Sequence, residues 1–140
     1  MIRFHTLVDT GPIVAYLVKS DRYHRWACDV LGTRPSPLHT CEAVLTEAFH
    51  LLSRTTGGSD GLSELLRQGH IRVGLHGDDE LDRILALMAK YADVPMSFAD
   101  ACLVRMAELH EEAVVLTVDR DFRVYRKNGR AVIKALFPRA

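Results

Sequence analysis

Apolar residues in this chain form two kinds of pattern: short continuous runs, and longer segments in which they recur every three or four positions. The short runs predict strands at 6–8, 38–40, 71–73 and 113–118, and a last edge strand at 132–133. The periodic segments predict helices at 13–17, 26–31, 42–53, 63–67, 78–88 and 97–110. Strands that alternate with helices are typical of an α/β fold with a parallel sheet and right-handed crossovers.

Turn-forming residues separate these segments. Pro12 suits the first turn of a helix, where its missing N–H is not needed. Pro35 and Pro37 predict a loop, and Gly57 and Gly58 predict a break in the chain. Because no repeat, low-complexity stretch or linker interrupts the series, we expect a single domain over residues 1–140.

Composition narrows the class of protein. Of the 140 residues, 48% are hydrophobic, as in an ordinary globular domain. No apolar run approaches the roughly 18 residues that a membrane span needs, and Asp9 interrupts the apolar stretch near the N-terminus. We therefore expect a cytoplasmic protein that does not bind membranes. The three cysteines are odd in number and widely spaced, which argues against a disulfide framework or a zinc site.

Basic residues are unevenly distributed although the formal net charge is zero. From Arg120 onward, seven Lys and Arg residues are opposed only by Asp121, which leaves a net charge of +6. If this segment folds beside an active site, it can hold the phosphates of RNA. The alternative is an ordinary solvated surface. The candidate RNA-binding residues are Arg120, Arg123, Arg126 and Lys127.

Two carboxylates directly follow predicted strands. Asp9 ends the strand at 6–8, and Asp119 ends the run at 113–118. Because parallel strands bring their carboxyl ends to one edge of a sheet, we expect these two side chains to lie close together. Each also precedes a helix, so each can alternatively be a helix N-cap.

Two further carboxylates lie on predicted helices. Glu47 lies mid-helix at the border of an apolar stripe, where it caps nothing, although a solvated edge position stays possible. Asp100 is flanked by Leu103 and Val104, a costly place for an unpartnered charge. Ser97 and Asp100 also match a capping box, which is the structural alternative for Asp100.

Four convergent carboxylates would repel one another without a cation. Mg²⁺ and Mn²⁺ prefer such oxygen ligands, and the chemistry typical of this site is phosphodiester hydrolysis. No Ser-His-Asp, Cys-His or phosphate-binding Gly-rich motif suggests a different reaction.

At these residues the sequence resembles the PIN-domain nucleases, and specifically the VapC-like toxins of toxin–antitoxin pairs. The resemblance rests on four segments in order, at 7–13, 42–48, 95–101 and 116–122, and spans nearly the whole chain. It implies that the catalytic, metal-binding acids are Asp9, Glu47, Asp100 and Asp119. Asp121 is a possible assistant, and Glu42 is a weaker rival to Glu47. Related sequences often have a second Asp where this chain has Ser97. The chain therefore lacks one possible outer ligand of a second metal, and Ser97 is itself only a possible assistant.

The resemblance also implies an architecture and partners. It implies a three-layer α/β/α sandwich with a central parallel sheet, a homodimer, RNA as substrate and a small protein antitoxin as partner. We expect the antitoxin to bind the first two helices and the Glu47 helix, where aromatic residues can anchor it. These aromatic residues are Tyr16, Tyr23, Trp26 and Phe49.

Two other functions are weighed against this one. The first is a PIN-like module that binds RNA or protein without cleavage. The presence of all four acids argues against it. A receiver domain is the second. It would need paired acids early in the chain and a Lys after a late strand, but this chain has one Asp after its first strand and no Lys between Lys90 and Lys127.

Overall fold

A central parallel sheet organises the molecule. The computed structural model describes residues 4–139. Its five strands have the order β3-β2-β1-β4-β7, and every neighbouring pair is parallel. The strands are β1 (Thr6–Val8), β2 (Leu38–Thr40), β3 (Ile71–Val73), β4 (Val114–Leu116) and β7 (Ala135–Leu136).

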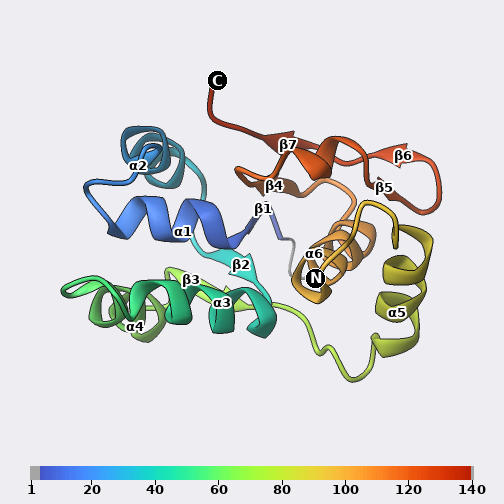
Figure 1. Cartoon of the computed structure of the whole chain (residues 1–140), viewed down its shortest axis with the longest axis horizontal. Coiled ribbons are helices and arrows are strands. Elements are labelled where there is room, and N and C mark those ends of the chain that lie inside the picture. The colour runs from blue at the N-terminus through green and yellow to red at the C-terminus, as the bar shows by residue number, and fades with distance from the viewer. Residues whose placement is uncertain (1–3, 140) are drawn as a thin grey trace.

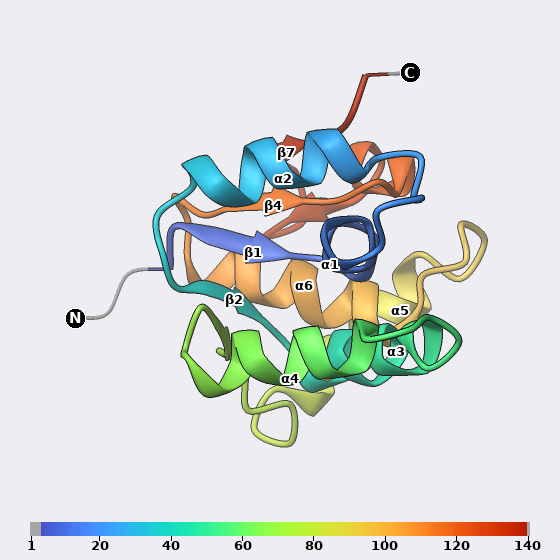
Figure 2. The same ribbon diagram turned by 90° about the vertical axis from the view of Figure 1, so that its left-hand side faces the viewer.

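Helices cover both faces of this sheet, so the predicted three-layer α/β/α fold is confirmed. In Figure 1, α1, α2 and α4 lie on one side of the sheet, and α5 and α6 lie on the other. Figure 2 looks onto the first of these sides. The helices are α1 (Thr10–Leu17), α2 (His24–Thr33), α3 (Glu42–Leu52), α4 (Gly58–Arg67), α5 (Leu81–Lys90) and α6 (Phe98–Leu109).

The last strand of the sheet differs from the prediction. Val132 belongs to β6 (Ala131–Val132), which pairs antiparallel with β5 (Arg126–Lys127) outside the main sheet. Asn128 and Gly129 make the turn of this hairpin with positive φ angles of 52° and 84°. The edge of the main sheet is β7, a few residues later. The Asn-Gly pair is a strong hairpin signal, so the sequence contained the information needed for the correct assignment.

Helix α4 begins at Gly58, well before the predicted start at 63. Gly57 takes a left-handed conformation with a φ of 76°, and the helix continues directly from it. A Cβ on Gly58 would collide with Thr55 and press on Leu52. These glycines therefore allow a close turn from α3 into α4.

The buried apolar side chains form one continuous cluster on both sides of the sheet. Helix α6 is buried along most of its length, as its nearly uniform apolar sequence predicted. Its first turn lies at the same end of the molecule as the carboxyl ends of β1 and β4, with Val8 in register with Leu116. Within residues 4–139 no helix has the length and hydropathy to cross a bilayer.

Candidate active site

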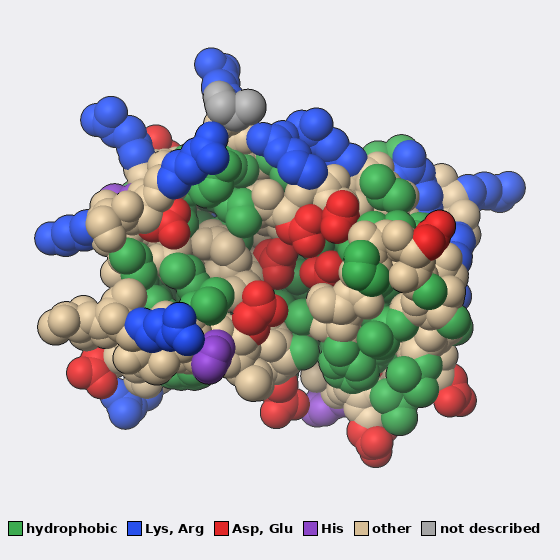
Figure 3. All heavy atoms as spheres, viewed as in Figure 1, with side chains coloured by type: hydrophobic (Ala, Val, Ile, Leu, Met, Phe, Trp, Pro, Cys, Tyr) green, Lys and Arg blue, Asp and Glu red, His purple; other side chains and the backbone are tan. Residues whose placement is uncertain are grey.

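One cleft brings together all four predicted catalytic acids. It has a volume of about 400 Å³ and opens at the carboxyl edge of the sheet. Asp9, Glu47, Asp100 and Asp119 line it, together with Asp121 and Ser97. Figure 3 shows acidic side chains gathered in the middle of this face, below a group of Lys and Arg side chains. Segments nearly the whole chain apart therefore meet at one point.

Asp9 is the most enclosed of the four acids, with only 7% of its surface exposed. Its Oδ1 accepts a hydrogen bond from the Thr10 amide at 2.8 Å, which caps α1. Its Oδ2 accepts one from the Thr117 hydroxyl at 2.7 Å. Burial raises the pKa of Asp9 to about 6; the two hydrogen bonds oppose this rise, and the charges of Asp100 and Asp119 add to it.

Thr117 joins the two strand ends of the site. While its hydroxyl donates to Asp9, it accepts a hydrogen bond from the Asp119 amide at 2.9 Å. Gly11 allows the start of α1 to approach this strand end, because a Cβ there would collide with Val118. One hydroxyl therefore fixes Asp9 and orients the backbone of Asp119.

Asp100 is held by a tyrosine from a distant segment. The Tyr125 hydroxyl donates to Asp100 Oδ2 at 2.9 Å, and the Tyr125 ring packs edge-on against Phe122 and Tyr91. Burial raises the pKa of Asp100, and the charge of Asp119 raises it further. The hydrogen bonds with Tyr125 and Ser97 oppose this rise. The Ser97 hydroxyl accepts from the Asp100 amide at 3.0 Å, so Ser97 caps α6.

Asp119 begins the short 3₁₀-helix η1 (Arg120–Arg123). Its Oδ1 accepts a hydrogen bond from the Asp121 amide at 2.9 Å. Burial raises the pKa of Asp119, and the neighbouring charge of Asp121 raises it further. Asp121 also lines the cleft, which is consistent with the assisting role that the resemblance implied.

Glu47 reaches the cleft from the exposed side of α3. Leu51, one turn further along α3, lines the cleft beside it. Glu42 instead lines a separate cavity with Cys41 and Cys102. Position in the fold thus distinguishes the two candidates, and Glu47 is the glutamate at the site.

The chemistry of these side chains fits a hard divalent cation. The site offers only carboxylate and hydroxyl oxygens, and two of its carboxylates are buried without a basic partner among their hydrogen bonds. Across residues 4–139, no three Asp, Glu, His or Cys side chains stand close enough to hold an ion unaided. Mg²⁺ suits this spacing, because proteins usually bind it through one or two carboxylates, with waters and substrate phosphates as the other ligands.

The PIN domain family matches residues 6–128, which is most of the chain and includes all four acids. The chain belongs to the PIN domain family. Ribonuclease VapC26 of Mycobacterium tuberculosis is a relative that is 24% identical over 116 residues, which cover 81% of this chain and 86% of the relative. The resemblance seen in the sequence is therefore confirmed at the level of the family.

A solved structure shares the fold. The crystal structure of VapC20 of Mycobacterium tuberculosis, described as a sarcin–ricin loop cleaving toxin, superposes with a TM-score of 0.76. The match covers 85% of this chain and 93% of that chain, at 21% sequence identity. The two chains therefore share their architecture despite low sequence identity.

The basic residues of this PIN domain have different surroundings. Arg120 and Arg123 are exposed on η1 and line a groove of their own. Arg126 instead donates to three backbone carbonyls, those of residues 123, 124 and 125. Lys127 does not fit the predicted RNA-binding role. It is 6% exposed and its ammonium donates to the Glu111 carbonyl at 2.7 Å, so phosphate binding would break that contact.

Sequence reasoning missed Thr117 and Tyr125 as parts of the site. Thr117 lies inside a β-rich run, where its residue type is ordinary. Tyr125 lies 25 positions from the carboxylate it contacts. The only signal for Thr117 was its position, two residues before Asp119, at the end of a strand.

Proposed function

We propose that this PIN domain is a Mg²⁺- or Mn²⁺-dependent endoribonuclease and the toxin of a toxin–antitoxin pair. The observation that carries the proposal is the convergence of four carboxylates, from four separate segments, on one cleft. A relative named as a ribonuclease and a fold neighbour described as a sarcin–ricin loop cleaving toxin support the same function.

Asp9, Glu47, Asp100 and Asp119 would surround the metal, with one or two of them as direct ligands and with water and RNA phosphate as the others. A divalent ion held there would lower the pKa of an attacking water and would stabilise the leaving oxygen of a phosphodiester. Within the chain, Thr117 and Tyr125 fix the orientation of Asp9 and Asp100. The exposed guanidinium groups of Arg120 and Arg123 lie beside the cleft and can hold RNA phosphates.

Cleavage assays test this function. Single-stranded RNA should be cut with Mg²⁺ or Mn²⁺ and left intact with excess EDTA. Asp9→Asn should lower the rate by more than about a hundredfold, since loss of a group that only supports a metal ligand already costs ten- to a hundredfold.

Asp60→Asn is the matched control, because Asp60 is exposed on α4 and does not line the cleft. It should cleave at the wild-type rate. Undiminished cleavage in EDTA would overturn the metal-dependent mechanism. Binding of RNA without any cleavage, with or without metal, would favour the alternative of a non-cleaving module.

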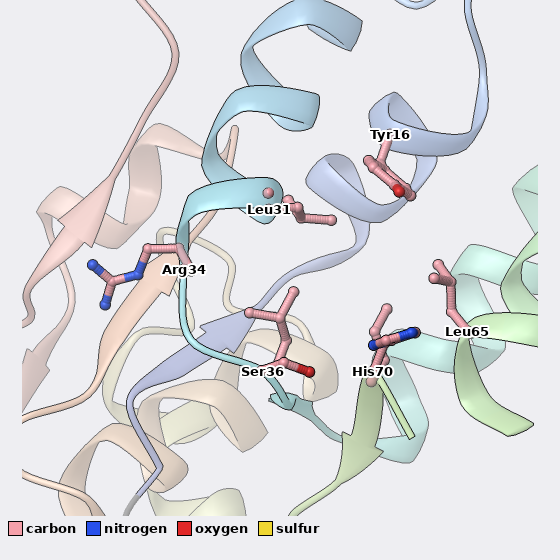
Figure 4. Close-up of a pocket in the computed structure, with 9 residues that line it drawn as sticks. Tyr16, Leu31, Arg34, Ser36, Leu65 and His70 are labelled. Carbon is pink, nitrogen blue, oxygen red and sulfur yellow. The ribbon is translucent and has the colours of Figure 1, made fainter. Parts of the chain in front are cut away.

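The proposed antitoxin site lies on the α1, α2 and α4 side of the sheet. A cavity of about 180 Å³ opens there, and Figure 4 shows Tyr16, Leu31 and Leu65 around it, one from each of these helices. The sequence favoured α3 as the third helix of this surface, but α4 borders the cavity. Of the four predicted aromatic anchors, Tyr16 is the one that lines it.

This cavity shares no lining residue with the acidic cleft. An antitoxin that is anchored here and also blocks the cleft must therefore extend around the molecule. An Arg side chain delivered to the cleft would suit its carboxylates, because a guanidinium binds them in bidentate fashion. We propose that the protein acts in the cytoplasm, where RNA is available. We also propose that it is a homodimer, and light scattering of the purified protein would measure its mass directly.

A further inference from the structure

A second groove lies next to the acidic cleft. Its volume is about 460 Å³, and it lies between η1 and the segment that follows β7. Strand β7 runs parallel to β4, and the Thr117 amide donates to the Leu136 carbonyl at 3.2 Å. The residues after β7 therefore emerge at the sheet edge that carries Asp9 and Asp119.

The helix η1 borders both hollows. Asp121 lines the acidic cleft, whereas Arg120 and Arg123 line the second groove. An extended polymer whose reacting phosphate lies at the carboxylates would therefore place its neighbouring unit in this groove. The two hollows differ in charge, because one is acidic and the other is basic.

Three arginines and no acidic residue line the groove: Arg120, Arg123 and Arg139. None of them takes part in the ion pairs found within residues 4–139. Arg120 is steadied by a hydrogen bond to the Pro138 carbonyl at 3.0 Å, so its guanidinium is held at the groove. This charge favours an anionic occupant.

An aromatic ring lies close to two of these cations. The guanidinium carbon of Arg123 is 4.8 Å from the centroid of the Phe137 ring, and that of Arg120 is 5.3 Å from it. Phe137 is partly exposed and lines the same groove. Flat groups of this kind, an aromatic ring with guanidinium planes beside it, are the surfaces on which unpaired nucleobases stack.

We infer that this groove binds the nucleotide of single-stranded RNA next to the bond that is cut. The base stacks on the surface formed by Phe137 and Arg123, and the flanking phosphates contact Arg120 and Arg139. This inference rests on the proposed ribonuclease function and adds to it a base-binding subsite, with Phe137 as a substrate-positioning residue.

Binding measurements in EDTA test the subsite without requiring cleavage. Fluorescence anisotropy would follow a labelled single-stranded RNA of about eight nucleotides as it binds wild type and Phe137→Leu. Leucine keeps the groove apolar but removes the π-face, so affinity should fall roughly 5- to 100-fold, the range for loss of one base–aromatic stack. The salt dependence of binding should be unchanged, since no phosphate contact is lost.

Arg120→Gln should behave differently, because this subsite assigns Arg120 to a flanking phosphate. It should weaken binding and reduce the slope of log affinity against log salt by roughly 0.7, the value for one phosphate contact to a single strand. Tyr23→Leu is the matched control, because Arg22 lies over the Tyr23 ring at 5.0 Å outside the groove. That variant should bind RNA like wild type.

A series of RNAs with one abasic position each identifies the stacked base. At one position, base removal should weaken wild-type binding while leaving Phe137→Leu unaffected. If Phe137→Leu binds the intact RNA as tightly as wild type does, the stacking subsite is wrong. It is also wrong if no single abasic position removes the difference in affinity between wild type and Phe137→Leu. If the wild type binds RNA in a Phe137-dependent way but does not cleave it in Mg²⁺, the result would instead count against the proposed ribonuclease function. Thermal melts check that every variant is folded.

Discussion

Single residues in the cleft have structural and functional roles at once. Asp9 and Asp119 both cap helices, as the structural alternative from the sequence stated. Each does so through one carboxylate oxygen, and both side chains still line the cleft. The capping interpretation and the catalytic interpretation therefore do not exclude each other.

Asp100 allows a test at this scale. Asp100→Asn should leave the metal-free protein as stable as wild type or more stable, because it removes a buried charge near other carboxylates and its amide oxygen can still accept from Tyr125. RNA cleavage should be lost. Thermal melts in EDTA, with Asp60→Asn as the exposed control, measure the first effect.

The capping-box alternative predicts the opposite sign for this variant. If the Asp100 side chain stabilised the start of α6, its loss would cost roughly 0.5–2 kcal/mol. In the structure the Ser97 hydroxyl caps this helix. A clear fall in melting temperature would therefore show that the carboxylate of Asp100 contributes to the cap.

The residues that sequence reasoning missed show what a linear pattern lacks. Position after a strand or within a helix marked the four acids as candidates, and the resemblance to the PIN-domain nucleases implied that they act together. The hydrogen bonds that orient them depend on register between β1 and β4 and on the packing of Tyr125 against α6, which spacing along the chain does not encode. Lys127 is the reverse case, since its charge suggested exposure but its ammonium is satisfied by a backbone carbonyl.

At the scale of elements, an ion-pair network centred on one buried carboxylate joins α5, α6 and the β5–β6 hairpin. The side chain of Glu108 is fully buried. Arg83 donates to both of its oxygens, at 3.0 and 2.7 Å, and Arg105 and the Asn128 amide also donate to it. Burial alone would raise the pKa of Glu108, but these donors outweigh it and lower the pKa.

Glu108→Gln should destabilise the protein at neutral pH by about 3 kcal/mol, the lower end of the range for breaking a buried ion pair. The lower end applies because Arg83 is partly exposed, so water can still solvate its charge when the carboxylate is removed. A depressed pKa in the folded state contributes stability above the ordinary value of 4.5, and this contribution is lost as the pH falls through the folded pKa. The difference between variant and wild type should therefore shrink below about pH 4.5. Urea unfolding at several pH values measures it.

Glu112→Gln provides the comparison for this network. Glu112 also pairs with a cation, Lys134, but its side chain is 78% exposed. An exposed pair contributes little, so this variant should stay within about 1 kcal/mol of wild type. If the two variants lose the same free energy of unfolding, burial of the Glu108 carboxylate has no energetic consequence.

Most elements were predictable from apolar periodicity, and the errors have local causes. The edge strand was placed three residues too early because the turn of the β5–β6 hairpin was overlooked. Helix α4 began earlier than expected because a glycine in a left-handed turn can precede a helix as well as end one. Such choices depend on backbone conformation, which hydrophobic patterns do not report.

At the scale of the whole molecule, the proposed function predicts toxicity. Expression of the wild type alone in a permissive host should arrest growth, because the cleft would cut cellular RNA without an inhibitor. Asp9→Asn should not arrest growth. Co-expression of a small protein encoded beside the gene should restore growth. Growth curves with induction measure each outcome.

Equal arrest by wild type and Asp9→Asn would mean that the toxicity is unrelated to the carboxylates. Absence of arrest in both would remove the support for a toxin in that host. Immunoblots of both proteins keep these outcomes interpretable, because they show that the expression levels match.

The segment that completes the basic groove lies outside the part of the chain that matches the family. That match ends at residue 128, and the groove residues contributed by β7 and its continuation begin at Ala135. All four acids lie inside the match. On the inferred subsite, substitutions at Phe137 and Arg139 would change which base is preferred beside the cut bond and would leave the four acids in place. Related nucleases with the same carboxylates could then differ in their RNA targets through the few residues that follow β7.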